Sequence, residues 1–147
     1  MANVKININS SNNTAVIQRD YLYRDLNTNL LKNDNKTDIK TNDDITAIFG
    51  SLQNLFSYTP GERMLEPEFG MDFRKILYSQ MNEKTANALG VYVYNKIKEW
   101  ETRINISSID ITPDYDDNTY YITVYFTVKG IKTEKDIEFT YSLSKFY

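Results

Sequence analysis

The chain contains neither cysteine nor histidine among its 147 residues. The absence of cysteine excludes a disulfide framework and thiolate chemistry. The absence of histidine removes the commonest general base and the commonest metal ligand, so we expect no cofactor and no metal. A basic excess, typical of nucleic-acid binders, is also missing, because the net charge is −3. No apolar run approaches transmembrane length and no signal-peptide pattern opens the chain, so neither nucleic acid nor a membrane is an expected partner.

The composition that remains is globular, with 41% apolar and 14% aromatic residues, including 12 tyrosines. Tyrosine is common both in strands and at protein–protein interfaces. Residues 1–20 are rich in Asn and Ser and are expected to be a flexible N-terminal extension, although residues 4–8 alternate as in a short strand. Residues 21–147 are expected to form one domain, with 21–26 extended and docked on the core and 32–44 an exposed connector.

Apolar residues at helical spacing predict the helices. The first begins at Asp43 or Asp44, both good N-cap residues, and a longer one runs from Glu83 to Glu101 behind an Asn82 cap. Between them, Asp72 to Tyr78 is expected to form a two-turn helix. The inward faces of the two longer helices are expected to comprise Ile45, Ile48, Phe49, Leu52, Leu55 and Phe56, and Ala86, Leu89, Val93, Ile97 and Trp100.

From Ile104 onward the apolar period changes to two, which predicts strands. The first is expected to stop at Pro113, ahead of a turn over residues 114–118. A second strand over 120–128 and a third over 137–143 follow after short connections. The prediction is an α+β fold, in which an N-terminal arm precedes three helices packed on a C-terminal three-stranded antiparallel meander.

A stiff, charged loop leading into the short helix occupies residues 59–77. Pro67 fixes its own φ and restricts Glu66 before it, while Gly61 and Gly70 permit conformations that a Cβ would forbid. Asp72 is placed to cap the short helix or to lie in its first turn. Rigid loops between helices often carry function.

Three carboxylates of this loop, Glu62, Glu66 and Glu68, could be proposed as the acid and nucleophile of a glycoside hydrolase. That chemistry requires two carboxyl groups across a sugar-binding cleft, one of them in an apolar pocket that raises its pKa. Arg63 and Arg74 nearby favour the ionised forms, and no aromatic-lined cleft is evident. Surface charge or an interface ion pair is the favoured interpretation, and no catalytic residue is assigned.

A cluster of Asp114, Asp116, Asp117 and Asn118 has oxygen ligands suited to calcium. It lacks the glycine and the distal glutamate of an EF-hand loop, so a hairpin turn is the favoured interpretation.

Two further places could bind a partner. At the junction of the long helix and the first strand, Glu101 and Arg103 would be either a helix end or an exposed ion pair for a bidentate partner contact, and the spacing alone favours the helix end. The meander has at least one free edge unless something covers it, and free edges are templates for strand addition. The sequence therefore indicates a docking module.

In this order, the elements resemble the lysozyme-named, sheath-nucleating baseplate wedge family of contractile phage tails, T-even-like in character, to which the type VI secretion component TssE is similar. The resemblance covers residues 21 to 147 and leaves the first 20 outside. It is carried by the first helix and by the segments Tyr23–Leu26, Arg63–Asp72, Trp100–Ile104 and Pro113–Tyr120.

The resemblance implies a structural subunit of the virion that is assembled in the host cytoplasm. Its partners would be the other baseplate wedge proteins, the tail sheath protein and proteins next to the tail tube. The family's wedge-binding Glu-Pro-Arg motif would fall on Glu101, Thr102 and Arg103, with Thr102 in place of proline. The residues of the interaction loop would be Gly61, Arg63, Glu66, Pro67, Phe69 and Gly70. The residues of the sheath-facing strands would be Tyr121, Tyr125, Phe139 and Tyr141.

Two other functions were weighed against this one. A muramidase carried on the tail would use Glu66 or Glu68 and would give the family name its literal meaning. A sheath or tube subunit would need self-assembly arms, and the chain is short for that role.

Overall fold

The computed structural model describes residues 4–8, 15–19, 21–27, 41–131 and 135–144. The chain divides into two compact units, Met1–Ala47 and Ile48–Tyr147, and each is described by itself. A division at residue 20, expected from composition, stays a prediction.

The first unit contains two short antiparallel pairs. Strand β1 (Val4–Ile8) pairs with β2 (Ala15–Arg19), and β3 (Arg24–Leu26) pairs with β4 (Thr41–Asp43). The alternation of residues 4–8 thus marks a strand, which is one of the two possibilities that the sequence left open. The flexibility expected of residues 1–20 stays a prediction. The end of the predicted connector is also a strand, whereas residues 32–40 lie outside the described residues.

Asp44 supports this unit in a way that the sequence did not indicate. It adopts a positive φ of 48°, and its Oδ1 accepts hydrogen bonds from the backbone N–H groups of Leu22 and Tyr23 at 3.0 and 3.2 Å. Leu22 and Leu26 are 53% and 65% exposed. The expected docking of residues 21–26 on the core stays a prediction.

The second unit contains the expected meander. Strands β5 (Ile104–Asp114), β6 (Thr119–Val128) and β7 (Ile137–Ser144) pair antiparallel in that order. The sequence predicts that β5 stops at Pro113, but this prediction is wrong. Pro113 lies inside the strand, opposite Tyr120. An edge strand tolerates proline because one row of its backbone groups has no ladder partner.

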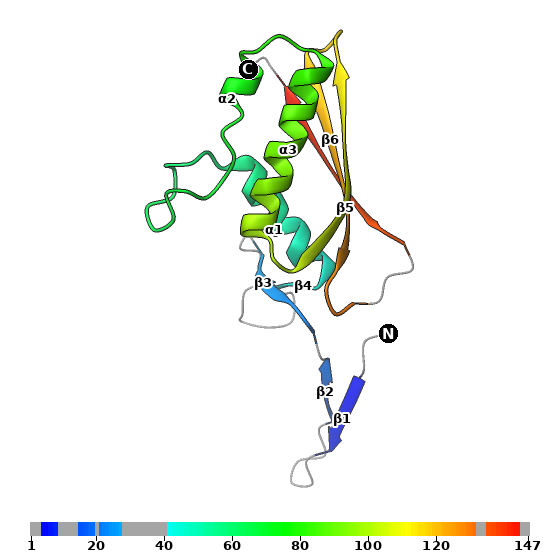
Figure 1. The fold of residues 1–147 in the computed structure, drawn as a ribbon. Helices are drawn as coiled ribbons and strands as arrows, with labels where there is room; N and C mark the ends of the chain where they lie inside the picture. The colour runs from blue at the N-terminus through cyan, green and yellow to red at the C-terminus, as the bar shows by residue number, and fades with distance from the viewer. Residues whose placement is uncertain (1–3, 9–14, 20, 28–40, 132–134, 145–147) are drawn as a thin grey trace. The chain divides into compact units, whose positions relative to one another are not determined.

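The helices α1 (Ile45–Ser57) and α3 (Glu83–Trp100) lie against one side of this sheet (Figure 1). The expected faces meet there, because Leu52, Leu89 and Phe126 are fully buried. Aromatic rings join the layers: Phe56 of α1 lies 5.5 and 4.9 Å from the ring centroids of Phe139 and Tyr141 on β7. The predicted α+β class is confirmed.

Local capping follows the sequence at two places and departs from it at a third. Asn82 accepts a hydrogen bond from the Thr85 N–H and caps α3, and Asp114 Oδ1 accepts from two backbone N–H groups of the β5–β6 turn. Helix α2 (Arg74–Leu77) has one turn and not two. Asp72 accepts from the Arg74 N–H and side chain, and so it orders the start of this turn.

Candidate functional site

The corner between α3 and β5 contains an internal ion pair. Glu101 is 3% exposed, and its two carboxylate oxygens accept hydrogen bonds of 2.7 Å each from Nε and Nη2 of Arg103. Burial acts to raise the pKa of Glu101, but hydrogen bonds from Arg103 and Ser51 and the charge of Arg103 outweigh it and hold the pKa below its usual value. Glu101 is therefore the helix end that the spacing favours, and not an exposed member of the pair, and its carboxylate also joins the corner to Ser51 of α1. Its part in binding a partner stays a prediction.

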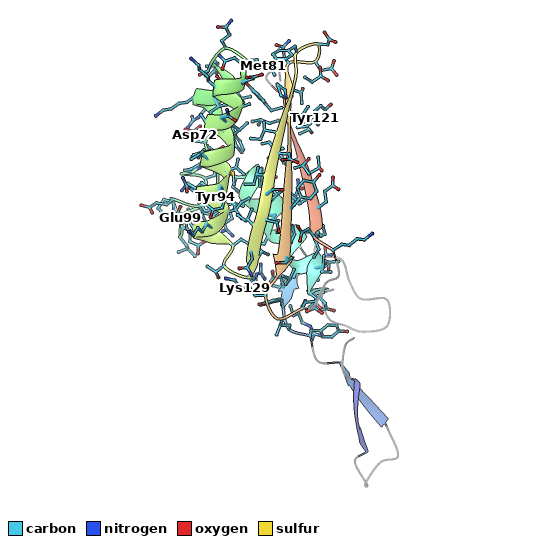
Figure 2. All side chains as sticks on the ribbon, turned by 45° about the vertical axis from the view of Figure 1, so that its right-hand side comes forward. Asp72, Met81, Tyr94, Glu99, Tyr121 and Lys129 are labelled. Atoms are coloured by element: carbon cyan, nitrogen blue, oxygen red, sulfur yellow. The ribbon has the colours of Figure 1, made fainter. Side chains whose placement is uncertain are left out.

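The exposed part of this corner is built by other groups. Thr102 is exposed, and its carbonyl accepts a hydrogen bond of 2.7 Å from Lys129 Nζ. Beside it is a hollow of about 340 Å³, whose rim includes Lys98 and Lys129. Figure 2 shows Lys129 near the end of the sheet and Tyr94, another lining residue, on α3. The corner thus presents positive charge around a buried, paired carboxylate.

The predicted interaction loop is held in one shape by its own residues. The Gly61 N–H donates to the Pro67 carbonyl at 2.7 Å, and Arg63 Nη1 donates to Glu66 Oε2 at 2.9 Å. The guanidinium of Arg63 also lies over the Phe69 ring, 4.2 Å from its centroid.

Gly70 fixes the end of this loop on the unit. Its φ is 106°, and a Cβ there would collide with the Tyr58 carbonyl, which accepts the Met71 N–H at 2.9 Å. Phe69 meets the Trp100 ring edge-to-face at 5.2 Å, so the loop is tied to the corner through aromatic packing. These contacts give the predicted loop residues a positioning role.

The four predicted sheath-facing residues are divided between the two faces of the sheet. Tyr121 is paired with Ser142 and Tyr125 with Glu138 on the outer, polar face, and Figure 2 shows Tyr121 on the sheet side of the unit. Phe139 and Tyr141 lie on the opposite face, where both contact Phe56. Their side chains face the helices because they lie opposite Val124 and Ile122 of the buried row of β6. The expectation that these strands face the sheath stays a prediction.

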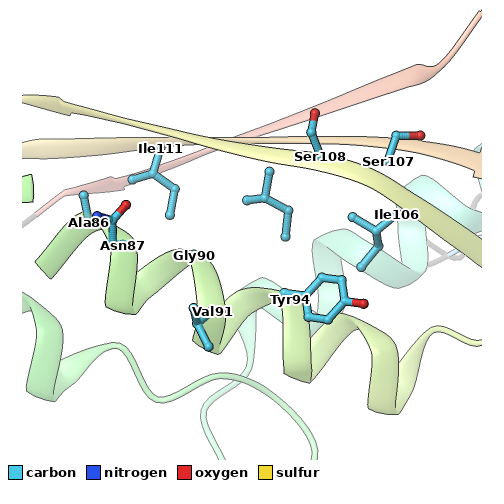
Figure 3. A pocket seen from close by; sticks show the side chains of 10 residues that line it. Ala86, Asn87, Gly90, Val91, Tyr94, Ile106, Ser107, Ser108 and Ile111 are labelled. Atoms are coloured by element: carbon cyan, nitrogen blue, oxygen red, sulfur yellow. The ribbon is translucent and has the colours of Figure 1, made fainter. Parts of the chain in front are cut away.

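A groove runs between α3 and the edge strand β5. Its volume is about 360 Å³, and Figure 3 shows Ile106 and Ile111 of β5 pointing toward α3 while Ser107 and Ser108 point away. The helix side is low because Gly90 has no side chain, and Val91 and Tyr94 on either side remain largely exposed. No sequence pattern had singled out this groove, although a glycine on a helix at the level of the β5 isoleucines was a signal of close approach.

The loop also carries the three carboxylates that were considered above as catalytic groups. Glu62, Glu66 and Glu68 are all exposed. Glu62 accepts the Thr59 N–H and Glu66 is paired with Arg63, so two of them serve the shape of the loop.

Two further features concern metal binding and membrane insertion of the described residues. Within the described ranges, no group of three or more acidic, histidine or cysteine side chains could hold a metal ion. None of the described helices combines the length and the apolar character needed to cross a membrane.

These features define a small α+β protein with a pre-shaped loop, a positively charged corner and an open sheet edge beside a groove. The family described as baseplate wedge protein gp25 matches residues 42–132, which is more than half of the chain, and the chain belongs to that family. It is a structural component of a tail baseplate of the virion, and as such it contacts other baseplate proteins.

Known relatives share most of their length with this chain. The baseplate wedge protein gp25 of Enterobacteria phage T4 is 29% identical over 117 residues, which are 80% of this chain and 86% of that protein. A baseplate structure of the anti-feeding prophage superposes with a TM-score of 0.65 at 16% identity, over 74% of this chain and 87% of the other. A putative tail lysozyme from Geobacter sulfurreducens gives a TM-score of 0.60 at 22% identity, over 67% and 87%. At these identities the two structures show the shared fold alone.

Proposed function

We propose that this chain is a non-enzymatic wedge subunit that anchors the first ring of tail sheath by accepting a sheath strand at the β5 edge. The observation that carries the proposal is the 11-residue strand β5, which lies at the edge of the sheet, pairs only with β6 among the described strands, and borders the 360 Å³ groove. Strand addition draws affinity from backbone hydrogen bonds and specificity from pockets for alternate side chains. An extended sheath segment whose apolar residues alternate with polar ones would pair with β5 and fill the groove.

The choice of β5 over β7 rests on what lies beside each strand. The apolar side chains of β7, such as Phe139 and Leu143, are already buried within the unit. Along β5, Ile106, Ile109 and Ile111 are only half-buried and line the groove. Covering this apolar surface would stabilise an added strand on β5.

We further propose that the corner at Glu101, Thr102 and Arg103 binds the helical core bundle of the wedge. The buried carboxylate of Glu101 is paired with Arg103, so in this proposal it positions the Arg103 side chain, which is 22% exposed. Lys98 and Lys129, which line the corner hollow, would contact an acidic side chain of the bundle. Reversing a rim charge with Lys98→Glu should weaken binding to purified wedge bundle proteins at least tenfold. Lys84→Glu, an equally exposed change at the other end of α3, is the matched control and should leave binding unchanged.

The sheath proposal is tested by seeding. Purified wedge complexes with and without this chain are mixed with sheath subunits and examined by electron microscopy. Sheath rings should start only on complexes that contain the chain. If complexes contain it and sheath growth ignores it, the chain is a baseplate brace and the anchoring role is wrong.

The alternative function, a muramidase using Glu66 or Glu68, has weaker support. One structural neighbour is described as a putative tail lysozyme, but that likeness shows the fold alone. A retaining or inverting glycosidase needs one carboxyl group shielded in an apolar pocket, whereas both of these side chains are exposed.

A further inference from the structure

The loop between α1 and α2 displays two adjacent apolar side chains at its tip. Met64 is 99% exposed and Leu65 is 98% exposed, and no other large apolar side chain in residues 21–27, 41–131 and 135–144 exceeds 86%. Single exposed apolar residues are common on protein surfaces and need no explanation. An adjacent pair with almost no contact to its own chain is a different case, because two large side chains gain nothing from this placement in the folded subunit.

The loop cannot easily bury this pair by folding back. Its neck is closed by the hydrogen bond from the Gly61 N–H to the Pro67 carbonyl, and a second bond runs from the Phe69 N–H to the Glu66 carbonyl. Arg63, next to the tip, is fixed by Glu66 and by the Phe69 ring. Figure 1 shows the loop projecting away from α1, α3 and the sheet of its unit. The backbone therefore holds Met64 and Leu65 outward in one conformation.

A rigid display of this kind lowers the entropy lost on binding, because the loop is already ordered before the partner arrives. Met64 and Leu65 are two of the four residues that line an open hollow of about 610 Å³, and both side chains are almost fully exposed, so a partner can reach them from several sides. A partner can thus surround the pair and need not merely touch it. Met is among the residues enriched at interfaces, since its flexible thioether adapts to irregular pockets.

The charges around the tip indicate what surrounds the partner's pocket. Glu62, Glu66 and Glu68 are exposed, and the single arginine among them is engaged by Glu66 and two aromatic rings. The rim of the tip is therefore acidic. Complementary charge favours a partner whose apolar pocket is bordered by lysine or arginine, and it disfavours an anionic lipid surface.

We propose that Met64 and Leu65 insert together into a basic-rimmed apolar pocket of a neighbouring baseplate protein. The proposal rests on the chain's place in a baseplate and is independent of sheath anchoring. It assigns the contact to the tip, whereas Gly61, Arg63, Glu66, Pro67 and Phe69 position it.

The first test uses the fact that the chain has no cysteine, so a single introduced thiol can be labelled cleanly. Met64→Cys carrying a polarity-sensitive fluorophore is assembled with the purified baseplate proteins of the same particle. Its emission should shift to the blue and its quenching by iodide should fall at least fivefold. Asp116→Cys, in the exposed β5–β6 turn, is the matched control and should show neither change.

A second test removes the apolar pair. Met64→Ser combined with Leu65→Ser should leave the thermal unfolding midpoint unchanged, because the two side chains make almost no internal contact. The dissociation constant for the purified baseplate proteins should rise at least tenfold, whereas Tyr78→Ser, at another exposed large apolar position, should leave it unchanged.

Three results would overturn the proposal. One is an unshifted fluorophore in baseplates that gel analysis shows to contain the labelled chain. Another is unchanged affinity of the folded double variant. The third is a blue shift produced by phosphatidylglycerol vesicles and not by the baseplate proteins, which would make the tip a membrane contact. Failure of sheath seeding alone, with the fluorophore shifted, would concern the anchoring role and leave the tip contact in place.

Discussion

Glu101 and Arg103, two residues apart, form a bidentate ion pair in which both hydrogen bonds are 2.7 Å long. The carboxylate is buried at the end of α3, while the guanidinium reaches partly to the surface at the start of β5. This geometry makes Glu101 a structural group that fixes the direction in which Arg103 is presented. It also explains why a substitution at this corner has to be judged by stability as well as by binding.

Replacing Glu101 by glutamine should reduce the free energy of unfolding at pH 7 by about 2 kcal/mol, since charged hydrogen bonds to a buried group are lost. The Glu101 pKa is lower in the folded state than in the unfolded state. The ionised pair therefore stabilises the fold above about pH 4.3, and this contribution is lost as the pH falls through the folded-state pKa.

Urea unfolding of the wild type and Glu101→Gln at pH 7 and at pH 3 measures this effect. The difference in the free energy of unfolding between the wild type and Glu101→Gln should be smaller at pH 3 than at pH 7. Glu99→Gln, in a surface pair with Lys96, should change stability by less than about 0.5 kcal/mol at both pH values. An equal loss for Glu101→Gln at both pH values would show that its charge is not the stabilising element.

Gly70 and Gly61 offer a matched comparison of strain with and without a collision. Both have φ near 100°, but a Cβ on Gly61 meets nothing within 4 Å, whereas one on Gly70 strikes the Tyr58 carbonyl. Gly61→Ala should cost about 1 kcal/mol and Gly70→Ala about 3 kcal/mol or more. Chemical denaturation gives both values, and similar losses would mean that the Tyr58 contact is not tight.

Two substitutions of Gly90 distinguish an effect on the stability of α3 from an effect on binding in the groove. A Cβ there lies 3.5 Å from Ile111 Cδ1, an ordinary contact, so Gly90→Ala should stabilise α3 by about 0.5–1 kcal/mol. Gly90→Leu should extend into the groove and abolish sheath seeding while the subunit still joins the wedge. Seeding counts by electron microscopy, with wedge incorporation as the control, decide this. Normal seeding by Gly90→Leu would exclude the groove from sheath binding.

Purified protein should not clear suspensions of bacterial cell wall, since the loop carboxylates lack a shielded acid. Turbidity is followed beside a known lysozyme as positive control. A purely structural role would be contradicted if the wild-type protein clears the suspension and both the Glu66→Gln and the Glu68→Gln variants do not.

The regular elements were predictable because their side-chain periods are local properties. Alternation over residues 120–128 and the helical stripe of α3 are both seen in the fold, since each element buries the face that its period predicts. The polar strand β4 was missed because Thr41–Asp43 has no apolar alternation and forms by pairing with β3. The residue pattern of one strand does not predict its pairing with a strand that is distant in the sequence.

The candidate site was predictable in position but not in detail. The loop, the corner and the sheet were singled out from residue types, whereas the burial of Glu101 depends on Ser51 of a different helix. Likewise, Phe139 and Tyr141 alternate as expected, but their pairing with Val124 and Ile122 is a register that neither strand's pattern specifies. The groove arises from two elements that meet in three dimensions, so no single stretch of sequence contains it.

Strand addition from the sheath to β5 is tested most directly by a cryo-electron microscopy map of the assembled baseplate with its first sheath ring. The map should show an additional strand that is continuous with a sheath subunit, is hydrogen-bonded along Ile104–Asp114 and has alternate side chains in the groove. A map in which the β5 edge is bare, or is covered by a protein other than the sheath, would contradict it.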